Sequence, residues 1–170
     1  IIKEYKNKTV LKGMNIGEIK KWCQEQATPL FRANQIYHWL YRHGIDNADD
    51  MKNLSKDLRN KINNETILST LTVQKIDKSS KELTQKILFK TIDNKLIEAV
   101  SMIDKDRHTI CISSQIGCNV NCDFCATGKM GLTRNLSTGE IIDQAIAIRN
   151  LVKKPITNVV FMGMGEPFHN

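Results

Sequence analysis

Hydrophobic residues in the first third of the chain recur at helical spacing. The segments that this period predicts as helices are residues 16–26, residues 31–44 and two short helices within residues 49–62. In the second segment Ile36, Trp39 and Leu40 share one helical face. Gly44 is expected to end that helix, because glycine adopts the left-handed conformation of a C-terminal cap without strain. Residues 1–66 are therefore predicted to form a small helical accessory module.

From Ile67 onward the pattern changes to that of β-strands. The runs predicted as strands are residues 67–76, 83–92, 95–103 and 108–115. The pair Asp93–Asn94 lies between two of these runs and predicts a hairpin turn. Residues 67–104 are thus expected to form a short β extension that leads into the last part of the chain.

The last third of the chain predicts one βαβ unit. Ser137 and Glu140 form a capping-box pattern that opens an apolar helix. Residues 157–163 follow as a short, fully apolar strand, which is typical of a parallel sheet covered on both faces. An α/β fold is therefore expected, with its chemistry at the C-terminal ends of the strands. One such unit cannot bury its own sheet, so the barrel begun in residues 105–170 is expected to be cut off at residue 170.

Composition adds limits on the class of protein. The chain has 170 residues, of which 41% are hydrophobic and 25% charged, and this is globular rather than disordered composition. Since no apolar run approaches the roughly 20 residues that cross a bilayer, a cytoplasmic protein without a membrane partner is expected.

The formal charge of +7 and the estimated pI of 9.2 favour polyanionic partners. The excess is spread along the chain, since residues 1–66 carry 12 basic and 8 acidic residues and residues 67–170 carry 13 and 10. A diffuse excess is weaker evidence for nucleic acid than a basic stripe. The helical module therefore has two open interpretations, a grip on a phosphate backbone or a cap that only packs on its neighbour.

Cysteine spacing is the most specific chemical signal. Of the five cysteines, three fall within eight positions as CxxxCxxC, namely Cys118, Cys122 and Cys125. Such crowding favours metal ligation in a reducing compartment over disulfides. A structural zinc site needs four ligands, so zinc would require a distant histidine such as His108 or His169. Three thiolates on a 4Fe-4S cluster instead leave one iron open, and that iron can bind S-adenosylmethionine (SAM).

A second motif lies one βαβ unit after the cysteines. The strand of residues 157–163 runs into Gly163-Met-Gly-Glu166-Pro167. Glycines allow close approach of a backbone to a ligand, and a carboxylate can accept hydrogen bonds from an ammonium group. Taken alone, the motif is weak evidence for a ligand site. Its position one βαβ unit after the cysteine loop strengthens that evidence.

These motifs resemble those of a known family. The CxxxCxxC spacing, with Phe124 before the last cysteine, is the signature of the radical SAM superfamily. The longer string CISSQIGCNVNCDFCATGKMGLTRNLSTGEIIDQ resembles the bacterial RNA adenine methyltransferases of the RlmN type. Their N-terminal helix-hairpin-helix-like module is similar to residues 31–62. The resemblance implies a radical SAM partial (β/α)6 barrel after the β extension.

The resemblance also implies roles for single residues. Cys118, Cys122 and Cys125 match the ligands of the 4Fe-4S cluster. Gly165 and Glu166 match the pair that holds the SAM amino group. Cys111 matches a thiol that resolves a covalent RNA adduct through a transient disulfide. Glu98 matches the family's proposed general base. From the residues alone, Cys111 also reads as a buried strand cysteine and Glu98 as a solvated acid.

The implied reaction is methylation of C2 of adenine in large-subunit ribosomal RNA and in transfer RNA, through a methyl-cysteine intermediate. The methyl-carrying cysteine is absent from this chain, since all five cysteines lie at or before position 125. The chain alone is therefore expected to bind a cluster without turning over. The expected protein is a monomer that uses an electron donor such as flavodoxin. The alternatives are the antibiotic-resistance type of methyltransferase, which modifies C8, and a non-catalytic RNA-binding protein with a structural metal site.

Overall fold

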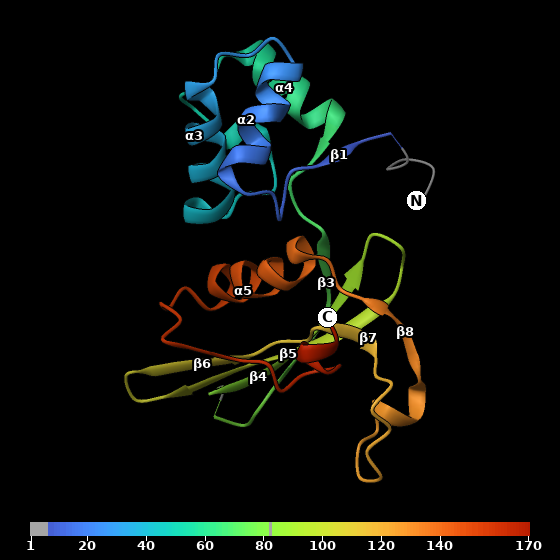
Figure 1. The fold of residues 1–170 in the computed structure, drawn as a ribbon. Coiled ribbons are helices and arrows are strands. Elements are labelled where there is room, and N and C mark those ends of the chain that lie inside the picture. The colour runs from blue at the N-terminus through green and yellow to red at the C-terminus, as the bar shows by residue number, and fades with distance from the viewer. Residues whose placement is uncertain (1–6, 82) are drawn as a thin grey trace. The chain divides into compact units, whose positions relative to one another are not determined.

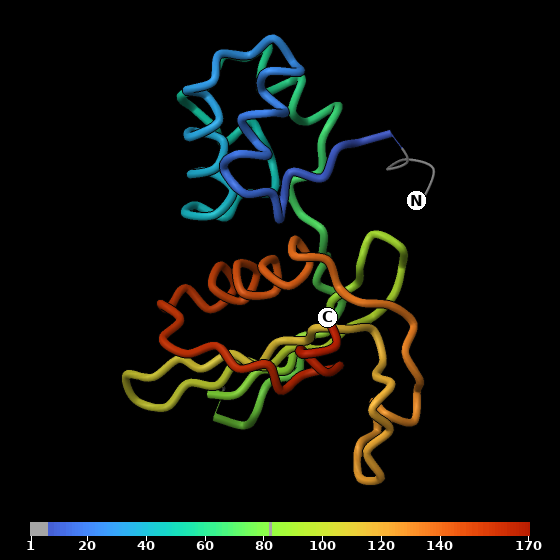
Figure 2. Tube along the Cα trace, viewed as in Figure 1, coloured from blue at the N-terminus to red at the C-terminus, as the bar shows by residue number. Residues whose placement is uncertain are grey.

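The structure is a computed structural model that describes residues 7–81 and 83–170. The chain forms two compact units, Ile1–Thr70 and Leu71–Asn170, and each is described by itself. Figures 1 and 2 show that the first unit is mainly helical, whereas the second combines one long helix with β-sheet. The expected α/β fold is confirmed. In the described residues, no helix is long and apolar enough to cross a membrane.

The helical unit contains the helices that the hydrophobic period predicted. Their bounds are α2 Ile16–Glu25, α3 Phe31–His38 and α4 Lys56–Glu65, with short helices at Trp39–His43 (η1) and Ala48–Asp50 (η2). Gly44 ends the second segment with φ 68°, as predicted. The end of that segment is a π-helix rather than an α-helix, because the Gly44 N–H donates to the carbonyl of Trp39, five residues earlier.

The predicted strand of residues 67–76 is wrong as a single element. Strand β2 (Thr66–Ile67) pairs in parallel with β1 (Thr9–Val10) inside the helical unit. Strand β3 (Leu71–Lys78) begins after a break and belongs to a different sheet. Leu68, within that break, is buried in the helical core, so the apolar run is shared between two cores.

In the described residues the second unit has a five-stranded sheet with the order β3-β4-β5-β6-β9. The remaining strands are β4 Thr84–Thr91, β5 Leu96–Asp104, β6 Arg107–Cys111 and β9 Asn158–Val160. Strands β3 to β6 are antiparallel, and β9 pairs in parallel with β6. Asn94 has φ 63° in the turn between β4 and β5, which confirms the predicted hairpin. The segments expected as β extension and as barrel thus share one sheet.

Helix α5 (Thr138–Val152) connects β6 to β9, so the predicted βαβ unit is confirmed. The predicted capping box is present, since the Glu140 N–H donates to the Ser137 side chain and the Ser137 N–H donates to the Glu140 carboxylate. The helix covers one face of the sheet, where Ile148 joins the core with Ile97 and Ile110 (Figure 1).

Two strand predictions near the C-terminal edge need correction. Residues 108–115 do not form one strand, because β6 ends at Cys111 and Gln115–Gly117 (β7) pairs with Leu132–Asn135 (β8) in a separate two-stranded sheet. The apolar strand of residues 157–163 is not covered on both faces. Only three of its residues are in β9, at the edge of the sheet, and Phe161 and Met162 are 46% and 80% exposed.

Candidate functional site

The cysteine loop leaves the second unit between strands β7 and β8. Its two ends meet at a backbone hydrogen bond of 3.1 Å from the Cys118 N–H to the Gly131 carbonyl. Gly117 has φ +79°, and a Cβ there would lie 1.8 Å from the Gly131 carbonyl oxygen. Only glycine therefore lets the two arms approach so closely. Figure 1 shows the loop extending away from the sheet, on the side opposite to α5.

The three predicted ligands lie at different depths in this loop. Cys118 is buried at the base, whereas Cys122 and Cys125 are half-buried. A turn links the latter two, with the Cys125 N–H donating to the Cys122 carbonyl at 3.0 Å. Hydrogen bonds from the backbone N–H groups of Gly128 and Thr127 lower the pKa of the Cys125 thiol. The loop thus already stabilises a thiolate, the form that binds metals.

The donor set suits an iron–sulfur cluster in its chemistry. One short loop supplies three thiols, and N–H groups directed at a sulfur also stabilise a cluster thiolate. Among the residues that the structure describes, no three His, Cys, Asp or Glu side chains gather closely enough to share one metal ion. In a cubane each thiolate binds a different iron, so a cluster loop needs no such convergence on a single point.

The histidines considered as a fourth zinc ligand lie in different surroundings. His108 is fully buried in the sheet, where its Nε2 lies 2.9 Å from Ser101 Oγ and its Nδ1 lies 3.2 Å from the Lys154 carbonyl oxygen. Both ring nitrogens are therefore engaged in the fold. His169 is exposed, and its backbone carbonyl accepts a hydrogen bond from Asn135. The structure thus gives His108 no free nitrogen for a metal.

The segment before the first cysteine packs directly on the glycine-rich motif. The N–H groups of Ser114 and Gln115 both donate to the Met164 carbonyl, at 2.9 and 3.1 Å. A Cβ on Gly163 would lie 2.7 Å from the Ile112 carbonyl oxygen, and one on Gly165, at φ +99°, would lie 2.5 Å from Gln115 Cβ. These glycines are therefore required for contact between the two motifs themselves, a reason that the sequence did not reveal.

This contact fixes the start of the Glu166 turn. The Glu166 N–H donates to Gln115 Oε1 at 2.9 Å, and Gln115 Nε2 donates to Asn135 Oδ1 at 2.8 Å. The half-buried carboxylate of Glu166 accepts the Phe168 N–H at 3.0 Å. Gln115 thus joins the base of the cysteine loop to the residue predicted to hold the SAM amino group.

A buried glutamine on α5 supports the same junction. Gln144 is fully buried, and its amide exchanges two hydrogen bonds with Ser113: Oε1 accepts the Ser113 N–H at 2.8 Å and Nε2 donates to its carbonyl at 2.9 Å. The Ser113 hydroxyl in turn donates to the Glu98 carbonyl at 2.6 Å. Gln144 was missed in the sequence analysis, where the polar pair Asp143-Gln144 among the isoleucines of an apolar helix was the available signal.

Arg134 was also missed as a supporting residue. Its guanidinium donates to both Asp93 oxygens, at 2.7 and 3.0 Å, and to both Glu140 oxygens, at 2.7 and 2.8 Å. Arg134 lowers the pKa of Asp93 to about 2, and the two carboxylates raise the pKa of the guanidinium. This bidentate pairing joins β8, the β4–β5 turn and the start of α5. The string TRNL after the cysteine loop, which contains Arg134, was the sequence feature that could have indicated this role.

The two predicted catalytic residues outside the loop lie on one face of the sheet. Cys111 pairs with Val100 across β5 and β6, and Glu98 lies two residues before Val100. Since paired residues and alternate residues share a face, Glu98 and Cys111 both lie on the face opposite to Ile97, Ile110 and α5. They are therefore on the side toward which the cysteine loop extends.

The surroundings of these two residues differ. Glu98 is about half exposed and forms an ion pair of 3.0 Å with Lys86, whose pKa it raises. Burial raises the pKa of the Cys111 thiol, and a smaller opposing effect comes from the Met162 N–H, which donates to its sulfur. Cys111 is thus held as a protonated thiol at the end of β6, and Glu98 is an accessible carboxylate.

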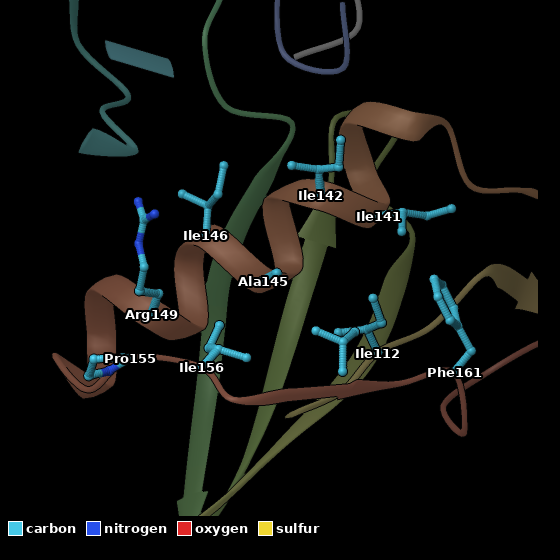
Figure 3. A pocket seen from close by; sticks show the side chains of 10 residues that line it. Ile112, Ile141, Ile142, Ala145, Ile146, Arg149, Pro155, Ile156 and Phe161 are labelled. Atoms are coloured by element: carbon cyan, nitrogen blue, oxygen red, sulfur yellow. The ribbon is translucent and has the colours of Figure 1, made fainter. Parts of the chain in front are cut away.

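An apolar cavity of about 610 Å³ lies beside α5, on the other face of the sheet. Figure 3 shows isoleucines of α5 above it and Ile112, Ile156 and Phe161 below it. No cysteine lines this cavity. Val159 of β9 and Phe161, which are 49% and 46% exposed, line it.

Comparison with known proteins adds family evidence for both units. Residues 9–68 match the family of the ribosomal RNA large subunit methyltransferase N-terminal domain, and residues 112–170 match the Radical SAM superfamily. A curated relative from Caldicellulosiruptor saccharolyticus, a probable dual-specificity RNA methyltransferase RlmN, is 42% identical over 96% of this chain and 47% of its own length. The dual-specificity RNA methyltransferase RlmN of Geotalea uraniireducens is 41% identical over the same shares.

A solved structure agrees with these relatives. A radical SAM methyltransferase from Sphaerobacter thermophilus matches with a TM-score of 0.90 and 41% identity, over 95% of this chain and 48% of that one. The chain therefore spans about half the length of the curated relatives it matches. The predicted resemblance is confirmed in sequence and in fold.

Proposed function

We propose that this chain, which belongs to the radical SAM methyltransferases of the RlmN type, provides the cluster-binding part of an enzyme that methylates C2 of adenine in large-subunit ribosomal RNA and in transfer RNA. The observation that carries the proposal is the junction between the cysteine loop and the Glu166 turn. One glutamine, Gln115, hydrogen-bonds to that turn and stands three residues before the first cysteine.

In this proposal Cys118, Cys122 and Cys125 hold a 4Fe-4S cluster. When bound, the cluster and SAM supply a carbon-centred radical, which can activate an otherwise inert carbon–hydrogen bond. Glu166, with Gly165 before it, accepts hydrogen bonds from the SAM amino group, because a carboxylate pairs strongly with an ammonium. The hydrogen bond from Glu166 N–H to Gln115 keeps that carboxylate near the base of the loop.

Glu98 and Cys111 are proposed to act on the RNA from the same face of the sheet. Glu98 is the proposed general base. Its half-exposed carboxylate forms an ion pair of 3.0 Å with Lys86 and is accessible to an adenine of the RNA. Cys111 is the proposed thiol that resolves the covalent adduct. Because burial raises its pKa, it rests as a thiol rather than as a nucleophilic thiolate. The enzyme is further proposed to be a cytoplasmic monomer that receives its electron from a donor such as flavodoxin.

Two measurements test these assignments. In the anaerobically reconstituted chain, Glu166→Gln is expected to weaken SAM binding about ten-fold or more, since a charge-assisted hydrogen bond is lost. Glu25→Gln, on the exposed end of α2, is the matched control and should leave SAM binding unchanged. Equal affinities of wild type and Glu166→Gln would refute the role of Glu166.

The target atom is tested in the chain extended to the length of its relatives. Nucleoside analysis of RNA after reaction should yield 2-methyladenosine, and Glu98→Gln or Cys111→Ala should abolish it. Recovery of 8-methyladenosine instead would overturn the C2 assignment in favour of the antibiotic-resistance type. A colourless protein with stoichiometric zinc would favour a non-catalytic metal-site protein.

A further inference from the structure

The helical unit has a polar, aromatic cavity of about 420 Å³, within the size range of small-molecule sites. Among the residues that the structure describes, its lining combines amide side chains with ring side chains and includes no aliphatic residue. The lining residues are Asn34, Gln35, His38, Trp39, His43 and Asn53. Of these residues, Trp39 also packs against the buried apolar core of the unit, whereas the other five carry polar side chains that are not part of that core.

The π-helix creates the aromatic wall of this cavity. A wide turn with a bond from residue i+5 to residue i brings the His38 and His43 rings together edge to face, with ring centroids 4.9 Å apart. The His43 ring also lies 4.3 Å from the Trp39 ring. In an α-helix, residues five apart point in different directions, so the irregular turn brings these rings together. Such π-helical turns occur frequently at functional sites.

The amides on the other side of the cavity are held in one orientation. Gln35 Oε1 accepts a hydrogen bond of 2.7 Å from Arg32, and Asn53 Oδ1 accepts one of 2.7 Å from Trp39 Nε1. Arg32 also donates to the Asn53 carbonyl at 2.8 Å. With both side-chain oxygens engaged, the amide NH2 groups are the parts that can donate to a ligand. The cavity therefore offers flat rings for stacking and donors for a ring edge.

We propose that this cavity binds one unpaired nucleobase of single-stranded RNA, with the base stacked on the His43–Trp39 rings and its edge bonded by Gln35 and Asn53. Aromatic platforms with edge-directed amides are the usual means of reading unstacked RNA bases. RNA is favoured over a peptide because residues 1–66 carry a net charge of +4 and match the N-terminal domain of a ribosomal RNA methyltransferase. The inference rests on the proposed RNA substrate and adds a site for it.

Binding is measured by fluorescence anisotropy of the whole chain with a labelled, unstructured ten-nucleotide RNA of A and U. His43→Ala is expected to weaken binding about ten-fold, because base–aromatic stacking is lost. His43→Phe, which keeps a ring, should bind nearly as wild type does. Asn53→Ala should clearly weaken RNA binding. Its matched control, Asn60→Ala on the exposed side of α4, should leave RNA binding unchanged.

Tryptophan emission gives a second readout, which needs neither His43→Ala nor Asn53→Ala. The chain has two tryptophans, and Trp22 is buried in the helical core. Addition of the RNA should quench the emission of Trp39, and Trp39→Phe should abolish the quenching. This measurement decides the matter if His43→Ala does not fold.

Several outcomes would overturn the proposal. They are equal binding of the single strand and of a ten-base-pair duplex, equal losses in Asn53→Ala and Asn60→Ala, or absence of quenching. Uridine or adenosine monophosphate binding as tightly as the ten-nucleotide RNA would show a free-nucleotide site instead. Since cluster content and SAM binding are measured independently, failure of the cavity leaves the proposed methyltransferase function intact.

Discussion

The base and the tip of the cysteine loop differ in how firmly the protein holds them. At the base, Cys118 is buried and Gly117 fits against Gly131 with no room for a side chain. At the tip, Phe124 is 93% exposed and Cys122 is only half-buried. The chain therefore determines where the loop starts and ends by its own packing. The arrangement of the outer two thiols depends much less on that packing.

The largest expected effect is at the base. Gly117→Ala should destabilise the second unit by about 3 kcal/mol or more, because the new Cβ meets a backbone oxygen at 1.8 Å and the residue has φ +79°. Chemical denaturation measures the change. Gly131→Ala is the comparison, because no atom lies within 4 Å of its added Cβ. Its backbone, with φ +68° and ψ 173°, lies in a region that only glycine adopts readily, so strain alone should cost about 1–3 kcal/mol, less than Gly117→Ala. Equal losses would refute the steric account.

A smaller loss of stability is expected from Gln144 of α5, whose side chain is buried beneath the base of the loop. Gln144→Leu removes both partners of the Ser113 backbone, and an unpaired buried polar group costs about 1–3 kcal/mol. We therefore expect about 2 kcal/mol from denaturation, together with weaker SAM binding because the loop base loosens. Gln24→Leu, on the exposed face of α2, should change stability by less than about 0.5 kcal/mol. An unchanged midpoint in Gln144→Leu would contradict this account of the junction.

The ion pairs of Arg134 should make the base sensitive to acid. The folded-state pKa of Asp93 is about 2, below the ordinary 3.8, so the unfolded chain takes up its proton first as pH falls. The stabilisation is fully present above about pH 5 and is lost between about pH 4 and pH 2. Since Asp93 is partly exposed, the effect is modest. Asp93→Asn should flatten this part of the stability curve, and an unaltered curve would rule out the pair as its source.

The smallest expected effect is at the tip. Phe124→Ala should change the free energy of unfolding by less than about 0.5 kcal/mol, because the ring is 93% exposed. Thermal denaturation followed by circular dichroism tests this. A loss comparable to that of Gly117→Ala would remove the contrast between base and tip.

The predictable parts of the molecule depend on local signals. The Ser137 capping box, the Asn94 turn and the Gly44 helix end all follow from a few neighbouring residues. The spacing of Cys118, Cys122 and Cys125 is equally local, and it led to the family that the comparisons confirm.

The features that sequence reasoning missed depend on contacts distant in sequence. Gln144 bonds to a residue 31 positions earlier, and the contact that requires Gly163 to lack a side chain is with Ile112. The exposure of Phe161 depends on what lies beside the sheet edge, which an apolar strand pattern does not report. The break after Cys111 likewise arises where the chain changes from one sheet to another.

The most direct test of the central claim is the iron and sulfide content of the chain after anaerobic reconstitution. The account predicts four irons and four sulfides per chain, with a broad absorbance near the blue end of the visible range, in wild type and in Cys111→Ser. Cys122→Ala should lose this absorbance and most of the iron. Full iron content and unchanged absorbance in Cys122→Ala, or no iron in the wild-type chain, would contradict the claim that these three thiols hold a cluster.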